Sequence, residues 1–217
     1  MEKRRHPTIQ KCRVVSVRVA KQYPEEVIDA GALPMLLSEI SKQAVGSNDS
    51  CWIMYALFNV IAQPLQNRTT THKAVVDAGL LPIIVDHIFF NPVVAQYHLI
   101  TQDAVNVRDY VLKMMNSIVT ISPQYAPAIL ECGAVAKCCA FFSSVELKGG
   151  KKEAKQAAHE ALKIIIALQN IIMPENTVHL AIAQCSGYSR IKRLTGHMDA
   201  DVRKAAAELM SMRAKVK

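Results

Sequence analysis

Cysteine and histidine are the residues of this sequence whose side chains could bind a metal ion. Cys132, Cys138 and Cys139 lie close together in the chain and could join a histidine in a zinc site. Structural zinc sites favour two closely spaced pairs of ligands, however, and the sequence contains no CxxC pair. We therefore expect the six cysteines to be reduced, buried, small apolar residues, and we expect neither a metal site nor a cofactor.

Motifs for catalysis are also lacking from the sequence. The seven histidines are scattered, and His87 and His98 do not have a ligand spacing such as HExxH. Residues 149–152 read GGKK, which lacks the leading glycine and the Ser/Thr of a phosphate-binding loop. A site assembled from distant residues would leave no such motif, so an enzyme stays an alternative. The expectation from the sequence is a non-enzymatic protein.

The composition indicates a helical protein with a substantial core. Hydrophobic residues make up 51% of the 217 residues and aromatic residues only 6%, which suits helices better than a β-sandwich. No apolar run reaches the roughly 20 residues of a membrane-spanning helix. The charged N-terminal segment lacks the apolar stretch of a secretory signal. We therefore expect an intracellular protein without a membrane span.

A repeated phrase reveals how the chain is organised. VIDAGALPMLLSEI at residues 27–40 is followed by VVDAGLLPIIVDHI at residues 75–88, and weaker copies occupy residues 128–142 and 180–194. Their glycines, Gly31, Gly79, Gly133 and Gly187, are spaced by 48, 54 and 54 residues. Four copies of one phrase predict a repeat architecture, in which each unit buries its apolar face against the next.

Each phrase predicts a tight corner between two helices. A glycine in the left-handed conformation ends the first, short helix, and a proline three residues later, as in Pro34 and Pro82, suits the first turn of the second helix. Apolar residues then recur with the spacing of one helical face. They are Leu33, Leu36, Leu37 and Ile40 in the first copy, Leu81, Ile84, Val85 and Ile88 in the second, Val135, Cys138, Cys139 and Phe142 in the third, and Tyr188, Ile191 and Leu194 in the fourth.

A longer third helix follows the corner in each unit. The predicted third helices cover residues 47–63, 105–122 and 153–172, and two further copies at residues 6–22 and 199–217 bracket the array. Residues 63–71, 89–104 and 143–152 read as insertions between the predicted helices.

The run PEEVIDAGALPMLLSEI, followed by YALFNVIAQ, resembles the armadillo repeat. That resemblance implies an all-α, right-handed superhelical solenoid of about four three-helix units, with the third helices lining a concave groove. It covers nearly the whole chain, as one domain over residues 1–217. The units are residues 1–22 (partial), 23–63, 71–122, 123–172 and 173–217. The spacings exceed the usual period of about 40–47 residues, so the resemblance requires the insertions.

The junctions between units are similar to those of one armadillo subgroup. VAKQYPEEVIDAGALP and VTISPQYAPAILECGAV resemble junctions in the armadillo proteins of the ciliary central apparatus and radial spokes. The resemblance implies a protein–protein interaction scaffold that is a structural subunit of the ciliary or flagellar axoneme, within the cytoskeleton. A soluble peptide-binding adaptor for nuclear transport or signalling is the alternative.

The armadillo family also suggests candidate residues in the groove. Its recognition motif, Trp-Ala-Leu-Ser-Asn, is matched by YALFN at residues 55–59, with Asn59 in place of the peptide-clamping asparagine and Tyr55 in place of the tryptophan. Trp52 lies one turn earlier, and the next unit offers Asn116 or, counted back from the following proline, Ser117. A full ladder of asparagines is not present, which disfavours nuclear import signals as ligands. Asn59 could instead hold the backbone of a neighbouring repeat.

Charge is concentrated at the two ends of the chain. Residues 1–21 carry seven basic residues against one acidic residue, residues 22–147 carry six against eleven, and residues 148–217 carry thirteen against six. Solvated helix faces are the default reading of the basic ends, and an acidic protein surface is the functional one. Nucleic acid is disfavoured because aromatic residues do not interleave with the basic ones. The candidate basic residues are Arg4, Arg5, Arg13, Arg18, Arg190, Lys192, Arg193, Arg203 and Lys204.

Overall fold

The computed structural model describes residues 24–31, 35, 69–88, 98–145, 152–172 and 176–215. Across these residues the chain forms helices and turns and no β-strand. The prediction of an all-α protein is therefore confirmed. Within the same ranges no single helix is long and apolar enough to cross a membrane, although the bent pair Pro123–Glu131 and Ala134–Phe142 passes that test when taken together.

The helices follow the predicted order of two short helices and one long helix. The short helices that open a unit are α2 (Pro24–Asp29), α5 (Thr69–Asp77), α8 (Ala126–Glu131), which follows the 3-10 turn η2 (Pro123–Tyr125), and α11 (Thr177–Gln184). The second helices are α6 (Leu81–Ile88), α9 (Ala134–Phe142) and α12 (Gly187–Leu194). The long helices are α7 (His98–Ile121), α10 (Lys152–Ile171) and α13 (Ala200–Lys215).

Glycine in the left-handed conformation forms the first three corners, as predicted. The φ angles of Gly31, Gly79 and Gly133 are 77°, 69° and 79°. At the second corner the amide of Gly79 donates to the carbonyl of Val76 and the amide of Leu80 to that of Val75, which satisfies carbonyls at the end of α5. A side chain at these positions would be strained, so the repeated glycine has a backbone cause.

The fourth corner differs from the prediction. The left-handed residue there is Ser186, with a φ of 56°, and not Gly187. Gly187 begins α12 and is buried, and a Cβ atom added to it would lie 2.5 Å from Sγ of Cys139 and 2.9 Å from Cγ2 of Ile182. This glycine is therefore required because α12 packs closely against α9 and α11.

The long helix α7 begins earlier than predicted. Residues 98–104 were expected to belong to an insertion, but they form its first turns. The physical reason is that the chain from Pro92 to Cys132 contains no glycine, and no proline until Pro123, so nothing in this stretch breaks the helix. Similarly, α5 begins at Thr69, inside the insertion predicted at residues 63–71.

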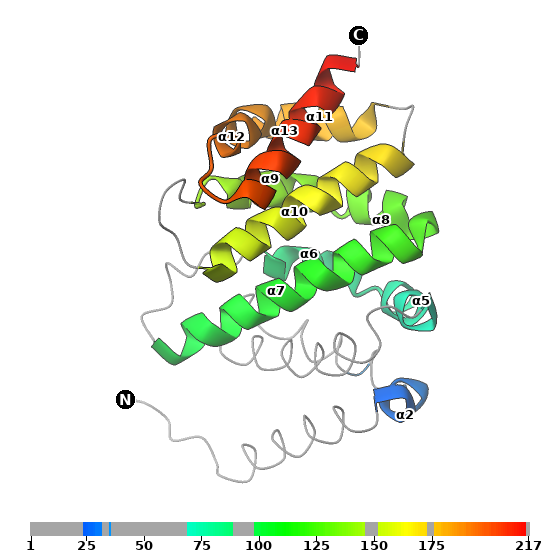
Figure 1. Cartoon of the computed structure of the whole chain (residues 1–217). Helices are drawn as coiled ribbons and strands as arrows, with labels where there is room; N and C mark the ends of the chain where they lie inside the picture. Colours follow the sequence, from blue (N-terminus) through cyan, green and yellow to red (C-terminus); the bar gives the residue numbers. More distant parts are fainter. Residues whose placement is uncertain are drawn as a thin grey trace.

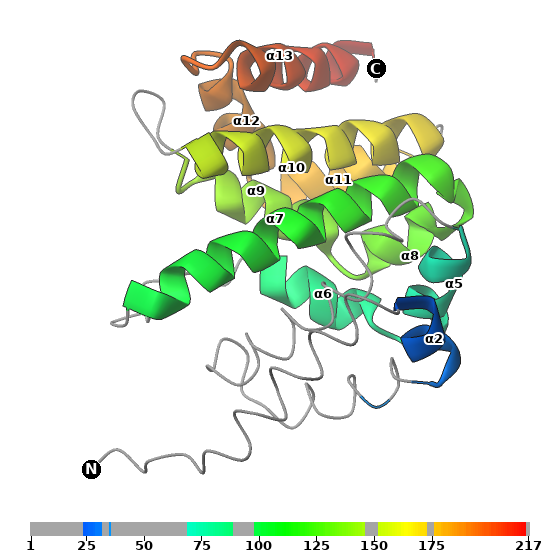
Figure 2. The same cartoon turned by 60° about the horizontal axis from the view of Figure 1, so that its bottom comes forward.

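The long helices lie side by side and form one layer of the molecule. Figure 1 and Figure 2 show α7, α10 and α13 running in the same direction, with α6, α9 and α12 behind them. Between the layers lies a continuous apolar core that includes Leu112, Ile165 and Leu209. The predicted stripes are buried there wherever the structure describes them, except that Tyr188 is only partly buried. The fold thus exposes one face of three parallel helices.

Candidate functional site

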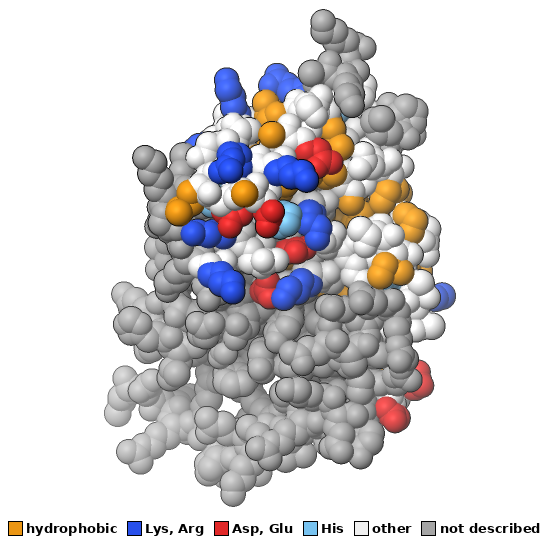
Figure 3. Space-filling view, in the orientation of Figure 1, with side chains coloured by type: hydrophobic (Ala, Val, Ile, Leu, Met, Phe, Trp, Pro, Cys, Tyr) orange, Lys and Arg blue, Asp and Glu red, His pale blue; other side chains and the backbone are white. Residues whose placement is uncertain are grey.

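The exposed face of the three long helices contains a hollow. Its volume is about 500 Å³ and its floor includes Ile166, Ala167 and Ala205. Acidic and basic side chains mix on this face of the molecule (Figure 3). The polar residues that line the hollow are Asn116 and Thr120 of α7, His159, Lys163 and Asn170 of α10, and Asp201, Lys204 and Glu208 of α13.

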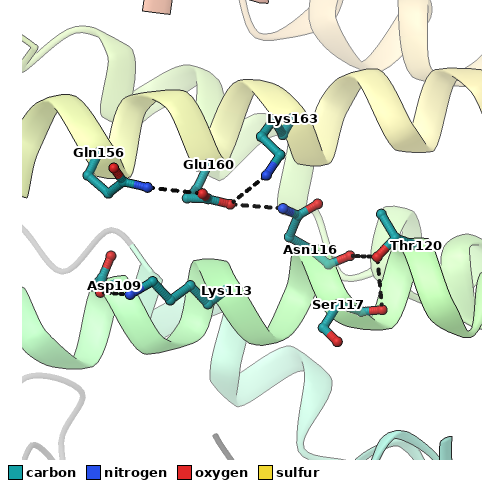
Figure 4. Close-up of polar contacts among 8 residues, drawn as sticks. All are labelled: Asp109, Lys113, Asn116, Ser117, Thr120, Gln156, Glu160 and Lys163. Atoms are coloured by element: carbon teal, nitrogen blue, oxygen red, sulfur yellow. Dashed lines mark hydrogen bonds and ion pairs between the residues drawn. The ribbon is translucent and has the colours of Figure 1, made fainter. Parts of the chain in front are cut away.

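Glu160 is the centre of a polar network between α7 and α10. Its carboxylate accepts hydrogen bonds from Nδ2 of Asn116 at 2.8 Å and from Nε2 of Gln156 at 3.1 Å, and Nζ of Lys163 lies 3.4 Å away. Figure 4 shows these side chains meeting between the two helices. Glu160 is only 8% exposed, and a carboxylate at that depth requires such partners. The network therefore joins α7 and α10 beside the hollow.

Asn116 has one polar atom that the fold does not use. Its Nδ2 donates to Glu160, whereas its Oδ1 is buried and has no hydrogen-bond partner. The backbone carbonyl of Asn116 accepts from Thr120 Oγ1 at 2.7 Å, as drawn in Figure 4. Asn116 lines the hollow, but this oxygen is shielded from solvent and is not open to a ligand there.

The two alternatives Asn116 and Ser117 lie in different surroundings. Ser117 is buried, and its Oγ lies 3.3 Å from Nε2 of His72, whose Nδ1 lies 2.8 Å from Oγ of Ser122. These three side chains connect α5 with the end of α7 inside the core. Asn116, in contrast, lines the hollow.

The boundary between α10 and α13 has no comparable network. Asp201, Lys204 and Glu208 line the hollow at helical spacings of three and four residues, which places them on one face of α13. Among the described residues none of these three charged side chains forms an ion pair or a side-chain hydrogen bond. Charged groups of both signs are thus left open to solvent along this boundary.

The basic residues predicted near the C-terminal end do not form one surface. One Nη of Arg193 donates to the carbonyls of Phe142 and Val145 and so holds the end of α9, while Arg203 donates to the carbonyl of His197 at 2.9 Å. Lys204 lies in the hollow, and Lys192 is exposed in the last turn of α12. Arg190, also on α12, is partly buried.

Several predicted residues lie outside the described part of the chain. They are the groove candidates Trp52, Tyr55 and Asn59 and the basic residues Arg4, Arg5, Arg13 and Arg18.

The cysteines that the structure describes belong to the packing of the helices. Cys138 and Cys139 are buried, and burial raises the pKa of both thiols, that of Cys138 to about 12. Such thiols are poor nucleophiles and poor metal ligands because both roles need the thiolate. Within the described ranges, no three His, Cys, Asp or Glu side chains lie close enough together to hold a metal ion.

The residues of the hollow were largely missed by sequence reasoning. Lys163, Asp201 and Glu208 occur on the predicted third helices, but no motif distinguishes them from ordinary solvated residues. The signal that was available is helical phase, because they lie opposite the apolar stripe of each third helix. Helical phase predicts which side of each third helix is polar. It does not show which polar side chains form hydrogen bonds or ion pairs with another helix.

Comparison with known proteins supports the fold alone. No family model and no curated protein matches the chain. Among solved structures the chain is similar to two engineered proteins from the Northeast Structural Genomics Consortium, each with 16% identity and a TM-score of 0.51. The alignments cover 97% and 95% of this chain and 93% and 90% of those chains. A third engineered protein has 17% identity and a TM-score of 0.50, over 91% of this chain and 52% of that one.

Proposed function

We propose that this chain is a non-enzymatic scaffold that binds other proteins, built as a right-handed solenoid of armadillo-like repeats. The observation that carries the proposal is the hollow over α7, α10 and α13. The family resemblance implies a concave groove lined by the same long helices, which supports this proposal. Its lining combines an apolar floor with the exposed side chains of Asp201, Lys204 and Glu208, which are unpaired among the described residues, and this suits a segment of another protein. The proposal includes no cofactor.

Filling the hollow tests this proposal. Ala167 is half-buried on the floor, so Ala167→Arg places a long side chain there, while Ala183→Arg puts the same side chain on the exposed surface of α11. With the full chain as bait, a natural partner should be captured by the native protein and by the Ala183→Arg protein, and lost with Ala167→Arg. Equal capture by all three proteins would mean that the partner does not use the groove.

The proposed setting is the ciliary or flagellar axoneme. Its support is the similarity of the junction sequences to those of the armadillo proteins of the central apparatus and radial spokes. A structural subunit should stay with the axoneme when ciliated cells are extracted with mild detergent. Quantitative release into the detergent fraction would contradict this setting and favour the soluble adaptor for nuclear transport or signalling.

For the adaptor, the residue to test is Asn59, the match to the peptide-clamping asparagine. Loss of a clamping amide should weaken peptide binding by about 1–3 kcal/mol, so Asn59→Ala should reduce affinity while stability is retained. Unchanged binding with unchanged stability would exclude Asn59 as a clamp.

A further inference from the structure

The charges along α13 have a definite order. From the start of the helix, the hollow is lined by the carboxylate of Asp201, the ammonium group of Lys204 and the carboxylate of Glu208. Each side chain is exposed and, in the part of the chain that the structure describes, unpaired. Unlike the interior polar groups, they have no role in holding the helices together. They are solvated, and a partner of complementary charge can pair with them without breaking a contact of the fold.

The opposite wall of the hollow does not cancel this pattern. Lys163 of α10 lies 3.4 Å from Glu160, so its charge is offset within α10 itself. His159 and Asn170 add hydrogen-bonding groups to the lining. The order of negative, positive and negative charge on α13 thus dominates the field within the hollow.

The spacing of these charges suits an extended peptide. With a rise of about 1.5 Å per residue, Asp201 and Lys204 are separated by roughly 4.5 Å along the helix axis, and Lys204 and Glu208 by roughly 6 Å. In an extended chain, side chains on one side recur about every 6.6–6.8 Å. Long arginine and glutamate side chains can span the small difference.

We propose that the hollow binds an extended segment of a partner protein in which basic, acidic and basic side chains alternate with small uncharged residues, selected by Asp201, Lys204 and Glu208. This inference rests on the proposed function of the groove and specifies its partner. A uniformly basic segment would meet Lys204, and a uniformly acidic one would meet both carboxylates, and like charges in contact oppose binding. The order of charges reads the same in both directions, so it does not depend on the polarity of the bound segment.

Three labelled heptapeptides test the selection by fluorescence anisotropy with the full chain. Serine separates the charged residues in each, which are Arg, Glu, Arg in the first, Glu, Arg, Glu in the second and Arg, Arg, Arg in the third. We expect the first to bind about fivefold more tightly than either of the others, as a few solvent-accessible charge pairs allow, and added salt to reduce the difference. Equal affinities for the three peptides would overturn the inference.

Reversal of one charge should change the preference. Lys204→Glu makes all three charges of α13 that line the hollow negative, so this protein should prefer the all-arginine peptide by about fivefold over the first peptide. Lys192→Glu on the exposed surface of α12 makes the same change in net charge away from the hollow and should keep the native preference. Identical effects of the two substitutions would show that net charge and not charge order decides, and would overturn the inference.

The Ala167→Arg protein separates this inference from the proposed function. If it loses the natural partner while the native chain does not distinguish the peptides, the groove binds a protein but the charge order does not select it. If Ala167→Arg leaves both partner capture and peptide binding intact, the proposed function and the inference fail together.

Discussion

The two boundaries between the long helices look alike in the backbone and differ in their polar side chains. Between α7 and α10, Glu160 accepts hydrogen bonds from Asn116 and Gln156 and lies next to Lys163. Between α10 and α13, Asp201, Lys204 and Glu208 line a hollow and are unpaired among the described residues. The polar side chains between α7 and α10 bind one another, whereas those of α13 stay exposed to solvent.

The difference separates the apolar side of each long helix, which packs in the core, from its polar side, which pairs at one boundary and stays exposed at the other. Each long helix is anchored by its apolar stripe, and this is true on both sides of α10. Because the apolar side suffices to stack the units, the polar side can either bind a neighbouring helix or stay open for a partner. The following predictions test this division, beginning with the largest expected effect.

Replacement of a buried leucine by alanine should lower the free energy of unfolding equally on both sides of α10. Leu112 of α7 and Leu209 of α13 are both fully buried, so Leu112→Ala and Leu209→Ala should each lower the free energy of unfolding by about 2–5 kcal/mol. Urea denaturation followed by circular dichroism measures both. A much smaller loss for Leu209→Ala would mean that α13 is held less firmly than α7, and the comparison would then concern packing as well as polar groups.

In the layer of second helices, a methyl group added at Gly187 should disturb the contact between α9 and α12. Its Cβ would lie 2.5 Å from Sγ of Cys139, so Gly187→Ala should destabilise the protein by about 1–3 kcal/mol. Gly196 is the matched control, because the nearest atom to its added Cβ is the carbonyl oxygen of Arg193 at 3.6 Å. The melting temperatures of Gly187→Ala and Gly196→Ala measure the difference. Equal melting temperatures would refute the close packing of α12.

The polar contrast itself is tested by one glutamate from each boundary. Glu160→Ala leaves Nδ2 of Asn116 and Nε2 of Gln156 without their acceptor and should cost about 1–2 kcal/mol of unfolding free energy. Glu208→Ala removes an exposed, unpaired carboxylate, and its effect on stability should stay within about 0.5 kcal/mol. If both substitutions cost the same, the two boundaries do not differ as described.

The smallest expected effect is a pH dependence of stability that arises where His179 and Tyr188 contact α13. Nδ1 of His179 is hydrogen-bonded to the hydroxyl group of Tyr188, and Arg213 of α13 lies 4.3 Å from the centre of the Tyr188 ring. Burial, and then the charge of Arg213, lower the pKa of His179 below its ordinary value of 6.5. The folded state therefore resists protonation of this histidine. Its contribution to stability is complete above pH 6.5 and is lost as the pH falls through the lower pKa of the folded state.

Urea denaturation between pH 5 and pH 8 should show this decline in the native protein and a weaker one in His179→Gln, whose side chain can still bond to Tyr188 but does not titrate in this range. An identical pH profile for the two proteins would contradict the role of His179.

Local signals made much of the fold predictable. The first three corners were found because only glycine adopts a positive φ without strain, and the second and third helices because their apolar residues repeat with helical spacing. The early start of α7 was missed because the sequence was read for the expected unit length. The fourth corner was misassigned because a glycine near a repeat position resembles a corner residue, although Gly187 is small to let two helices approach.

By itself the sequence determined that this chain is helical, that it repeats, and which face of each repeat is apolar, because these properties depend on residues within a few positions of one another. Only the tertiary structure decided that Asn116 donates to Glu160, 44 residues away, while Asp201, Lys204 and Glu208 of α13 are unpaired among the described residues. It also decided that Ser117 faces His72 in the core. Hydrogen bonds and ion pairs between helices depend on how the helices are brought together in space, and the spacing of residues within one helix does not contain that information.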